Sequence, residues 1–305
     1  MSTETTWNAH HGPILTEKDE WTVIDCSPCG FRHVVPLPTE EELREVYEHE
    51  YYTSEKPLYL ERVREDLAWW HELYDERFGA FESLKTSPGR RLLDVGSGPG
   101  FLLEFGKDRG WDVLGIEPSR TAAAHARELG VEVIEAFLDD SLAKELEPFD
   151  TIHLSEVLEH LPDPAAMVAR CRELLVPGGV LCVSVPNDFN PFQRALVDAG
   201  DQEPWWVAPP HHLNYFDFES LEGLLTRAGL AVQLRETSFP IDLFLVMGEN
   251  YVGNDELGRR CHGLRMAFED TLRRAGRLDL KRDLYHAFAD LGLGRLAVVH
   301  ARRED

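Results

Sequence analysis

The stretch from Arg91 to Phe101, RLLDVGSGPGF, constrains the fold of this chain more than any other segment. The apolar run 91–95 predicts a short buried strand, and Pro99 is favoured at the first position of the helix that follows. The glycines between them predict a tight turn. Because glycine has no Cβ, such a turn lets backbone N–H groups approach a bound ligand closely. We therefore expect a strand, a ligand-binding turn and a helix in succession.

The spacing of the glycines and the neighbouring acids indicate which ligand the turn binds. The turn reads G-x-G-x-G, whereas a dinucleotide fingerprint reads G-x-G-x-x-G. Asp94 ends the strand, where a carboxylate repels a pyrophosphate and attracts an ammonium or sulfonium group. A second strand, 112–116, leads to Glu117, which can accept two hydrogen bonds from a ribose diol. These features favour a cationic nucleoside. An NAD-binding oxidoreductase is the alternative, because Glu117 also suits that spacing.

Composition narrows the classes of partner. Lysine and arginine total 31 against 55 acidic residues, and this gives the chain of 305 residues a net charge of −24. A field of that sign disfavours nucleic acid and anionic membranes as partners. No run of eighteen apolar residues and no signal-peptide pattern occurs, so we expect a cytoplasmic protein. The five cysteines are irregularly spaced and do not predict a disulfide framework.

Strands and helices alternate from residue 89 onward, as in a doubly wound parallel sheet. The expected strands are 91–95, 112–116, 131–135, 149–154, 180–185, 230–237 and 295–301, and the expected helices are 99–109, 119–129, 164–175 and 218–228. A turn at 177–179 is expected to open the fifth strand. The predicted organisation is a small N-terminal segment 1–37, a helical cap 38–88, a ligand-binding domain 89–238 plus 294–305, and a helical insert 239–293. The insert is interpreted as packing on the sheet edge, as a contact in a homodimer, or as part of the substrate pocket.

The N-terminal segment contains a possible metal site. Cys26 and Cys29 form a C-x-x-C-G turn, which aims two thiolates at one point as in a zinc knuckle. Two further ligands are needed, and the candidates are His10, His11 and His33. The alternative is a pair of reduced cysteines in a turn.

The helical cap is predicted from two patterns. Thr39 and Glu42 form a capping box for a first helix, and apolar spacing predicts a second helix over 59–84. Between the two, Tyr51 and Tyr52 are interpreted either as a cover over the cofactor or as core residues.

Several segments in order resemble class I S-adenosylmethionine-dependent methyltransferases. They are the glycine turn, Glu117, the turn 136–140, SEVLEHLPDP at 155–164 and LVPGG at 175–179. The resemblance implies an α/β fold with a seven-stranded Rossmann-like sheet whose last strand is antiparallel. It also implies a cofactor site. The methionine part would lie at Asp94, Gly96, Ser97, Gly98 and Gly100, and the ribose at Glu117. The adenine would lie beside Pro118 and Ser119 and be bordered by Phe137, Leu138 and Asp139, with Ser155 and Glu156 on the floor of the site.

Residues with acid–base or metal-binding chemistry follow the fourth strand. Glu156, Glu159 and His160 are spaced i, i+3 and i+4, which predicts a common face on one helical turn. Together with His211-His212 they are similar to the metal site of small-RNA 2′-O-methyltransferases and to the matching segment of ubiquinone-pathway O-methyltransferases. That similarity implies a divalent ion, Mg or Zn, at Glu156, Glu159, His160 and His212. The alternatives are a structural role for Glu159 and His160, and a general base at His212 or His211. The H-L-x-Y-F pattern favours His212.

The resemblance predicts methyl transfer from S-adenosylmethionine to an oxygen of a small molecule or saccharide, with His212, His211, Glu156 and His160 as catalytic candidates. The C-x-x-C-G turn and His212-x-x-Tyr215-Phe216 also resemble bacterial saccharide methyltransferases that carry an N-terminal zinc module, although the first C-x-x-C of that module is missing here. A sugar C-methyltransferase is therefore the alternative, followed by a non-catalytic sensor of S-adenosylmethionine.

Overall fold

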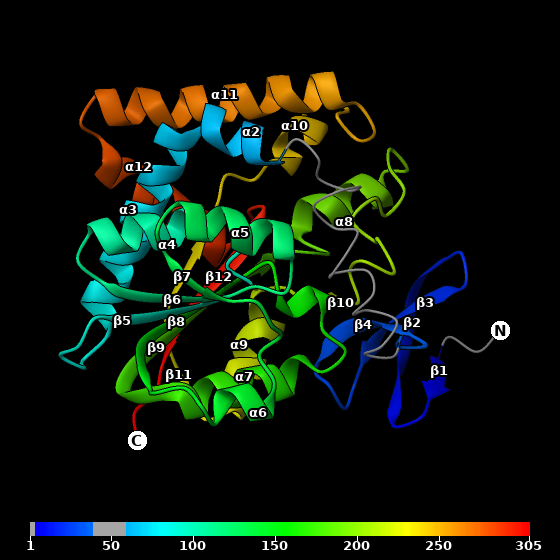
Figure 1. Ribbon diagram of the computed structural model, residues 1–305. Helices are drawn as coiled ribbons and strands as arrows, with labels where there is room; N and C mark the ends of the chain where they lie inside the picture. The colour runs from blue at the N-terminus through cyan, green and yellow to red at the C-terminus, as the bar shows by residue number, and fades with distance from the viewer. Residues whose placement is uncertain (1–3, 39–58) are drawn as a thin grey trace. The chain divides into compact units, whose positions relative to one another are not determined.

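The computed structural model describes residues 4–38 and 59–305 (Figure 1). Thr39, Glu42, Tyr51 and Tyr52, for which roles were expected from the sequence, lie outside the described residues. The chain forms two compact units. Counting only the described residues, one lies within 1–37, 184–223 and 234–299, and the other lies within 38–183, 224–233 and 300–305.

A seven-stranded sheet confirms the predicted α/β class. Its strands are β5 (Arg91–Val95), β6 (Asp112–Ile116), β7 (Glu132–Ile134), β8 (Phe149–Ser155), β9 (Leu175–Pro186), β11 (Ala231–Thr237) and β12 (Leu296–Arg302), in the order β11-β12-β9-β8-β5-β6-β7. β5 is parallel to both β6 and β8, and Asp94 is paired with Gly115 on one side and with His153 on the other. This register places the ends of β5, β6 and β8 at one edge of the sheet.

Helices cover both faces of these parallel strands, which explains why the strands read as nearly continuous apolar runs. Figure 1 shows α3 (Leu67–Leu84), α4 (Phe101–Asp108) and α5 (Arg120–Glu128) on one face, and α6 (Asp140–Ala143) and α7 (Pro164–Leu174) on the other. Leu92, Leu93 and Ile152 are completely buried between the two layers. The predicted helical run 59–84 is present as α2 (Tyr59–Glu65) followed by α3.

The fifth strand begins earlier than the sequence indicates. Residues 177–179 were expected to form a turn, but β9 already starts at Leu175. Gly178 N donates to Arg303 O (2.7 Å), and Arg303 N donates to Gly179 O (2.9 Å), so two residues of β9 face the one residue that directly follows β12. Gly178 has a φ of +79°, as expected for a glycine β-bulge. Further along, Asn187 N donates to Arg295 O, and this pairing makes β12 antiparallel to β9.

A second sheet occupies the N-terminal segment. It consists of β1 (Glu4–Trp7), β2 (His10–Lys18), β3 (Trp21–Cys26), β4 (Phe31–Val35) and β10 (Asn214–Tyr215), in that order. The strand near Trp21 was expected, whereas β1 and β2 were not, because their residues are mostly polar. β10 joins from a distant part of the chain, with Asn214 paired to His33.

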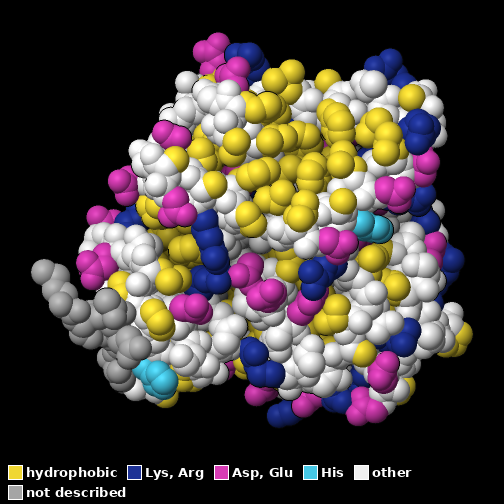
Figure 2. All heavy atoms as spheres, turned by 180° about the vertical axis from the view of Figure 1, so that it is seen from behind, with side chains coloured by type: hydrophobic (Ala, Val, Ile, Leu, Met, Phe, Trp, Pro, Cys, Tyr) yellow, Lys and Arg dark blue, Asp and Glu magenta, His cyan; other side chains and the backbone are white. Residues whose placement is uncertain are grey.

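The insert before β12 is helical, as predicted. It contains α10 (Asp242–Val246), α11 (Asp255–Arg274) and α12 (Leu278–Asp290). Phe239, Phe244, Cys261 and Tyr285 form its buried core. Hydrophobic side chains gather on the rear face of the molecule (Figure 2). The large exposed ones within the insert and its adjoining residues are Val246, Met247, Leu264, Leu278, Leu280 and Leu291.

Among the described residues, no helix combines the length and the apolar character needed to cross a bilayer. The α8 helix (Pro191–Asp198), for example, is far shorter than a transmembrane span.

Candidate functional site

The glycine turn after β5 is held against β6 by backbone hydrogen bonds. Gly96 N and Ser97 N both donate to Ile116 O, at 2.8 and 3.2 Å. Gly100 has a φ of +86°, and a Cβ built there would lie 2.6 Å from the Cβ of Ala126. Only glycine satisfies both the backbone conformation and the close approach of α5. The predicted turn is therefore a tightly packed loop that leads into α4.

Glu117 follows β6 and is only 4% exposed. Its Oε2 accepts from Gly98 N and its Oε1 accepts from Ser119 N, each at 2.8 Å. Burial raises the pKa of Glu117 to about 7, against the lowering effect of these two bonds, and the charge of Asp94 raises it further. A carboxylate has about four lone-pair sites, so two hydroxyl donors can still bind. The residues thus fit a nucleoside with a ribose diol.

Asp94 has a partner that the sequence did not indicate. Its Oδ1 lies 2.8 Å from Nδ1 of His153, the residue paired with it on β8, and both side chains are buried. Nearby, Ser97 Oγ is buried and has no hydrogen-bond partner within the described part of the chain. An acid, a hydroxyl and the glycine turn therefore meet where β5 and β8 end.

The residues expected around the adenine lie in the turns that follow β6 and β7. Ser119 caps α5, and Asp139 caps α6 by accepting from Ser141 N and Leu142 N. Leu138 is buried, and its carbonyl accepts from Arg170 Nη1 at 3.1 Å. Asp139 thus acts as a helix cap, and its place beside the adenine stays a prediction. The contacts of Pro118, Phe137 and Leu138 with adenine stay predictions.

The segment after β8 differs from the expected helical turn. Glu156 has a φ of +55°, and only Leu158–His160 form a short 3₁₀ helix, η2. Glu156 is exposed, whereas Glu159 is 1% exposed, so the two carboxylates face different surroundings. The prediction that Glu156, Glu159 and His160 share one helical face is therefore wrong. Glu159 Oε1 and His160 Nε2 do lie together, 3.8 Å apart.

The segment after β8 runs close against the glycine turn, because a Cβ added at Gly96 would lie 2.6 Å from Cγ2 of Val157. Ser155, expected on the floor of the site, is the last residue of β8.

The histidines of the other unit lie on a well-anchored loop. The backbone N–H of His212 donates to Ala208 O (2.9 Å), and the Tyr215 hydroxyl donates to the His212 carbonyl (2.9 Å) while accepting from Ala208 N (3.3 Å). Tyr215 itself is completely buried in β10. The catalytic and metal-binding roles of His211 and His212 stay predictions.

Asp188 is a candidate that the sequence analysis missed. It follows β9, is 2% exposed, and its Oδ2 has no hydrogen-bond partner among the described residues. Burial raises its pKa to about 7. A carboxyl that titrates near neutrality is suited to acid–base chemistry. The sequence feature that could have indicated Asp188 is its position directly after an apolar strand, in the segment Pro-Asn-Asp.

The N-terminal turn brings its cysteines to two of the three candidate histidines. His10, Cys26, Cys29 and His33 each direct a ligand atom to one place, whereas His11 is exposed and is not part of the group. Neither cysteine is in a disulfide.

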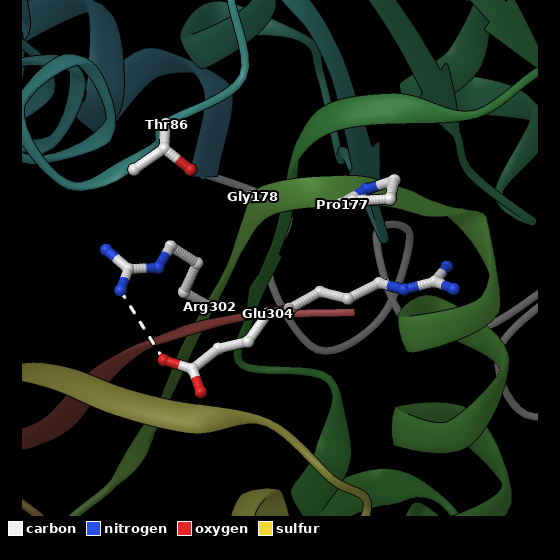
Figure 3. Close-up of a pocket in the computed structure, with 6 residues that line it drawn as sticks. Thr86, Pro177, Gly178, Arg302 and Glu304 are labelled. Carbon is white, nitrogen blue, oxygen red and sulfur yellow. Dashed lines mark ion pairs between the residues drawn. The ribbon is translucent and has the colours of Figure 1, made fainter.

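One pocket is lined by none of these residues. Thr86, Pro177, Gly178, Arg302, Arg303 and Glu304 line it, at the start of β9 and the end of β12 (Figure 3). Two of the lining residues form an ion pair, with Arg302 Nη2 and Glu304 Oε1 3.5 Å apart. The pocket contains none of the residues predicted for the cofactor.

Comparisons with known proteins identify the family of the chain. A family described as a methyltransferase domain matches residues 59–234, more than half of the chain. The ubiquinone biosynthesis O-methyltransferase of Hahella chejuensis is 37% identical over 154 residues, which cover 44% of this chain and 64% of the relative. The protein of the same name from Saccharophagus degradans is 34% identical over 183 residues, or 54% of this chain and 77% of the relative.

Among solved structures, a magnesium protoporphyrin IX methyltransferase from Synechocystis with bound SAH superposes with a TM-score of 0.52. It is 14% identical, and the match covers 87% of this chain and all of that one. This similarity concerns the fold alone. The chain spans 64% and 60% of the length of the first two curated relatives that it matches.

Proposed function

The chain belongs to the class I S-adenosylmethionine-dependent methyltransferases, and from this premise we propose that it methylates an oxygen atom of a small molecule. The sequence alone left an NAD-binding oxidoreductase as an alternative. The match to a methyltransferase domain and to named methyltransferases argues against that alternative. Oxygen is favoured over carbon because relatives such as the Saccharophagus protein are named as O-methyltransferases. A saccharide acceptor and a sugar C-methyl product are the second and third possibilities.

The observation that carries the proposal is the arrangement of Glu117. Its carboxylate is buried at the end of β6 and is held by Gly98 N and Ser119 N, with lone pairs left for two ribose hydroxyls. We assign the methionine part to Asp94, Ser97 and the loop Gly96–Gly100. Ligands of open α/β sheets bind beyond the carboxyl ends of the strands, and these residues occupy that edge.

When bound, S-adenosylmethionine supplies a methyl group activated by a sulfonium. The chain has to hold the acceptor oxygen about 3 Å from that carbon, in line with the bond that breaks. A hydroxyl acceptor also has to lose its proton. We propose that the imidazole of His212 accepts this proton as a general base. Asp188 is the second candidate, because burial raises the pKa of its carboxyl to about 7. A divalent ion near Glu159 and His160 stays a prediction from the sequence.

The test is product analysis with a methyl donor that carries a deuterated methyl group. The purified chain is incubated with a panel of phenols, catechols, polyols and saccharides, and products are identified by mass spectrometry and by the carbon chemical shift of the new methyl. A labelled methoxyl in at least one acceptor is expected, and Glu117→Ala, in which donor binding is weakened, should form less of it at the same donor concentration. A C-methyl product would contradict oxygen as the acceptor, and donor binding without any product would favour the sensor alternative.

A further inference from the structure

Four metal-ligating side chains meet in the N-terminal sheet, far from the residues assigned to the methyl donor in the sequence. His10 begins β2, directly after the turn of the β1–β2 hairpin, where it pairs with Trp7. Cys26 ends β3, Cys29 lies in the turn that follows, and His33 is on β4. One ligand atom from each of the four lies within 4.8 Å of all the others. Two neighbouring hairpins therefore direct two thiols and two imidazoles at one point.

The separations match those of a tetrahedral site. His10 Nδ1 lies 3.3 Å from Cys29 Sγ and 3.7 Å from Cys26 Sγ. A zinc ion with bonds of ~2.3 Å to sulfur and ~2.0 Å to nitrogen places such ligands about 3.5 Å apart. The two observed distances lie on either side of this value. Cys26 and Cys29 are not disulfide-bonded to each other.

His33 is oriented as metal-binding histidines are. Its Nδ1 lies 2.8 Å from the carbonyl oxygen of its neighbour Val34, so Nδ1–H donates and Nε2 carries a lone pair. Nε2 is buried and has no hydrogen-bond partner in the described part of the chain. A buried imidazole nitrogen without a partner costs stability, unless a ligand occupies it. The imidazole ring of His10 lies beside that of His33, with 4.7 Å between the two ring centroids.

Main-chain hydrogen bonds hold the C-x-x-C turn close to β2. Gly30 has a φ of +70°, and its N–H donates to Cys26 O (2.8 Å), which folds the C-x-x-C segment back on itself. Ser27 N donates to His11 O (3.0 Å) and ties this turn to β2. A Cβ at Gly12 would lie 1.9 Å from Asp25 O, so the two hairpins pack without space for a side chain. The ligands are thus brought together by main-chain contacts on both sides.

One hydrophobic cluster of the small sheet lies beside the cysteines. Among the described residues it contains Ile24, Cys26 and Val35, with partly buried Trp7, Ile14 and Cys29 packed on it. Four protein ligands leave no open coordination position, which is typical of structural rather than catalytic zinc.

We propose that His10, Cys26, Cys29 and His33 bind a structural Zn²⁺ ion that holds the N-terminal sheet together. Two thiolates and two imidazoles in tetrahedral geometry are a donor set that zinc prefers. The sequence alone left the second pair of ligands open, and a zinc module of the usual kind would have supplied another C-x-x-C.

The site has a consequence for the His211–His212 loop, and this step rests on the proposed function. His33 pairs with Asn214 of β10, and Val34 N donates to Leu213 O (2.9 Å). Arg32 on the same strand forms an ion pair with Asp217 at 2.7 Å. The strand that carries a zinc ligand therefore anchors the segment directly after His212. Loss of zinc is expected to lower kcat more than it weakens binding of the methyl donor.

The test measures metal directly and needs neither methyl donor nor acceptor, so its failure is distinct from that of the proposed function. The full chain is purified without chelator, and its metal content is determined by inductively coupled plasma mass spectrometry. We expect about one zinc per chain. His10→Asn and Cys29→Ser are expected to lose more than nine-tenths of it, whereas the matched control His11→Asn keeps it.

Two results would overturn the proposal. One is an unmodified chain that contains no zinc and takes up none when dialysed against Zn²⁺, for example because Cys26 and Cys29 have formed a disulfide. The other is a Cys29→Ser chain with undiminished zinc. If the variants do not fold, Co²⁺ replaces zinc in the unmodified chain. Thiolate-to-cobalt charge-transfer absorption supports the site, and its absence contradicts it.

Discussion

Gly98 donates its backbone N–H to Oε2 of Glu117 over 2.8 Å, and this bond ties the glycine turn after β5 to the end of β6. Glu117 therefore stabilises the turn, and under the proposed function its remaining lone pairs accept hydrogen bonds from a ribose. The bond also orients the loop whose amides are assigned to the methionine part of the donor.

Replacement of Glu117 is expected to weaken donor binding. Glu117→Ala removes the acceptor for two hydroxyl groups, and hydrogen bonds to a charged group contribute about 1.5–3 kcal/mol each. We expect the Kd for S-adenosylmethionine to rise at least about tenfold in isothermal titration calorimetry. Glu132→Ala, an exposed position on β7, is the control. An unchanged Kd in Glu117→Ala would show that the ribose lies elsewhere.

Donor affinity is expected to depend on pH through the same carboxyl. Burial raises the pKa of Glu117 to about 7, so near pH 6 only about a tenth of the chains carry the ionised form that accepts both ribose bonds. Affinity for S-adenosylmethionine should therefore rise about tenfold between pH 6 and pH 8. In Glu117→Gln the affinity is lower and this rise is absent. A rise of equal size in both proteins would assign the titration to another group.

The close packing at the glycine turn predicts a difference between two alanine variants. Gly100 and Gly110 have nearly the same φ, +86° and +85°, but only at Gly100 does a new Cβ meet neighbours, at 2.6 Å from Ala126. Gly110→Ala should cost about 1–2 kcal/mol of the free energy of unfolding, because of its backbone conformation alone. Gly100→Ala should cost about 1–3 kcal/mol more. Equal losses in urea unfolding would mean that α5 moves away easily.

Asp188 predicts a pH-dependent stability. Its folded-state pKa is raised by burial from 3.8 to about 7, so between these values the folded chain binds more protons than the unfolded chain. The free energy of unfolding should therefore fall as pH rises through this range. Asp188→Asn should remove this component and stabilise the chain at pH 8 by about 1–3 kcal/mol. Thermal unfolding at pH 5 and pH 8 measures both effects. If Asp188→Asn were less stable than the unmodified chain at pH 8, the ionised carboxylate would have stabilising partners in the folded chain.

A substitution at His212 is expected to lower kcat without changing the affinity for the methyl donor. His212→Asn should lower kcat by about 10²–10⁴, the usual contribution of a general base, while the Kd for S-adenosylmethionine stays the same. His211→Asn is the matched neighbour and should retain most of the activity. The measurement uses an acceptor identified by product analysis. Full activity in His212→Asn would transfer the role to Asp188 or to His211.

Local patterns in the sequence were sufficient for the main elements. The strand 91–95, the glycine turn and the strand 112–116 were predicted with the bounds that β5 and β6 have, because apolar runs and glycines act on neighbouring residues. The same reasoning failed at Glu156. A spacing of three and four residues predicts a shared face only if the backbone is helical, and the left-handed conformation of Glu156 removes that condition.

The sequence by itself determined the order of strands and helices, the glycine turn and the two acids at its sides, since backbone preference and hydrophobic periodicity are properties of short segments. Only the tertiary structure decided that His153 lies beside Asp94, that Asp188 is buried, and that His10 and His33 rather than His11 join the two cysteines. These relationships depend on the register between paired strands and on how closely hairpins pack. Those quantities arise from contacts between residues far apart in the chain, and no local pattern encodes them.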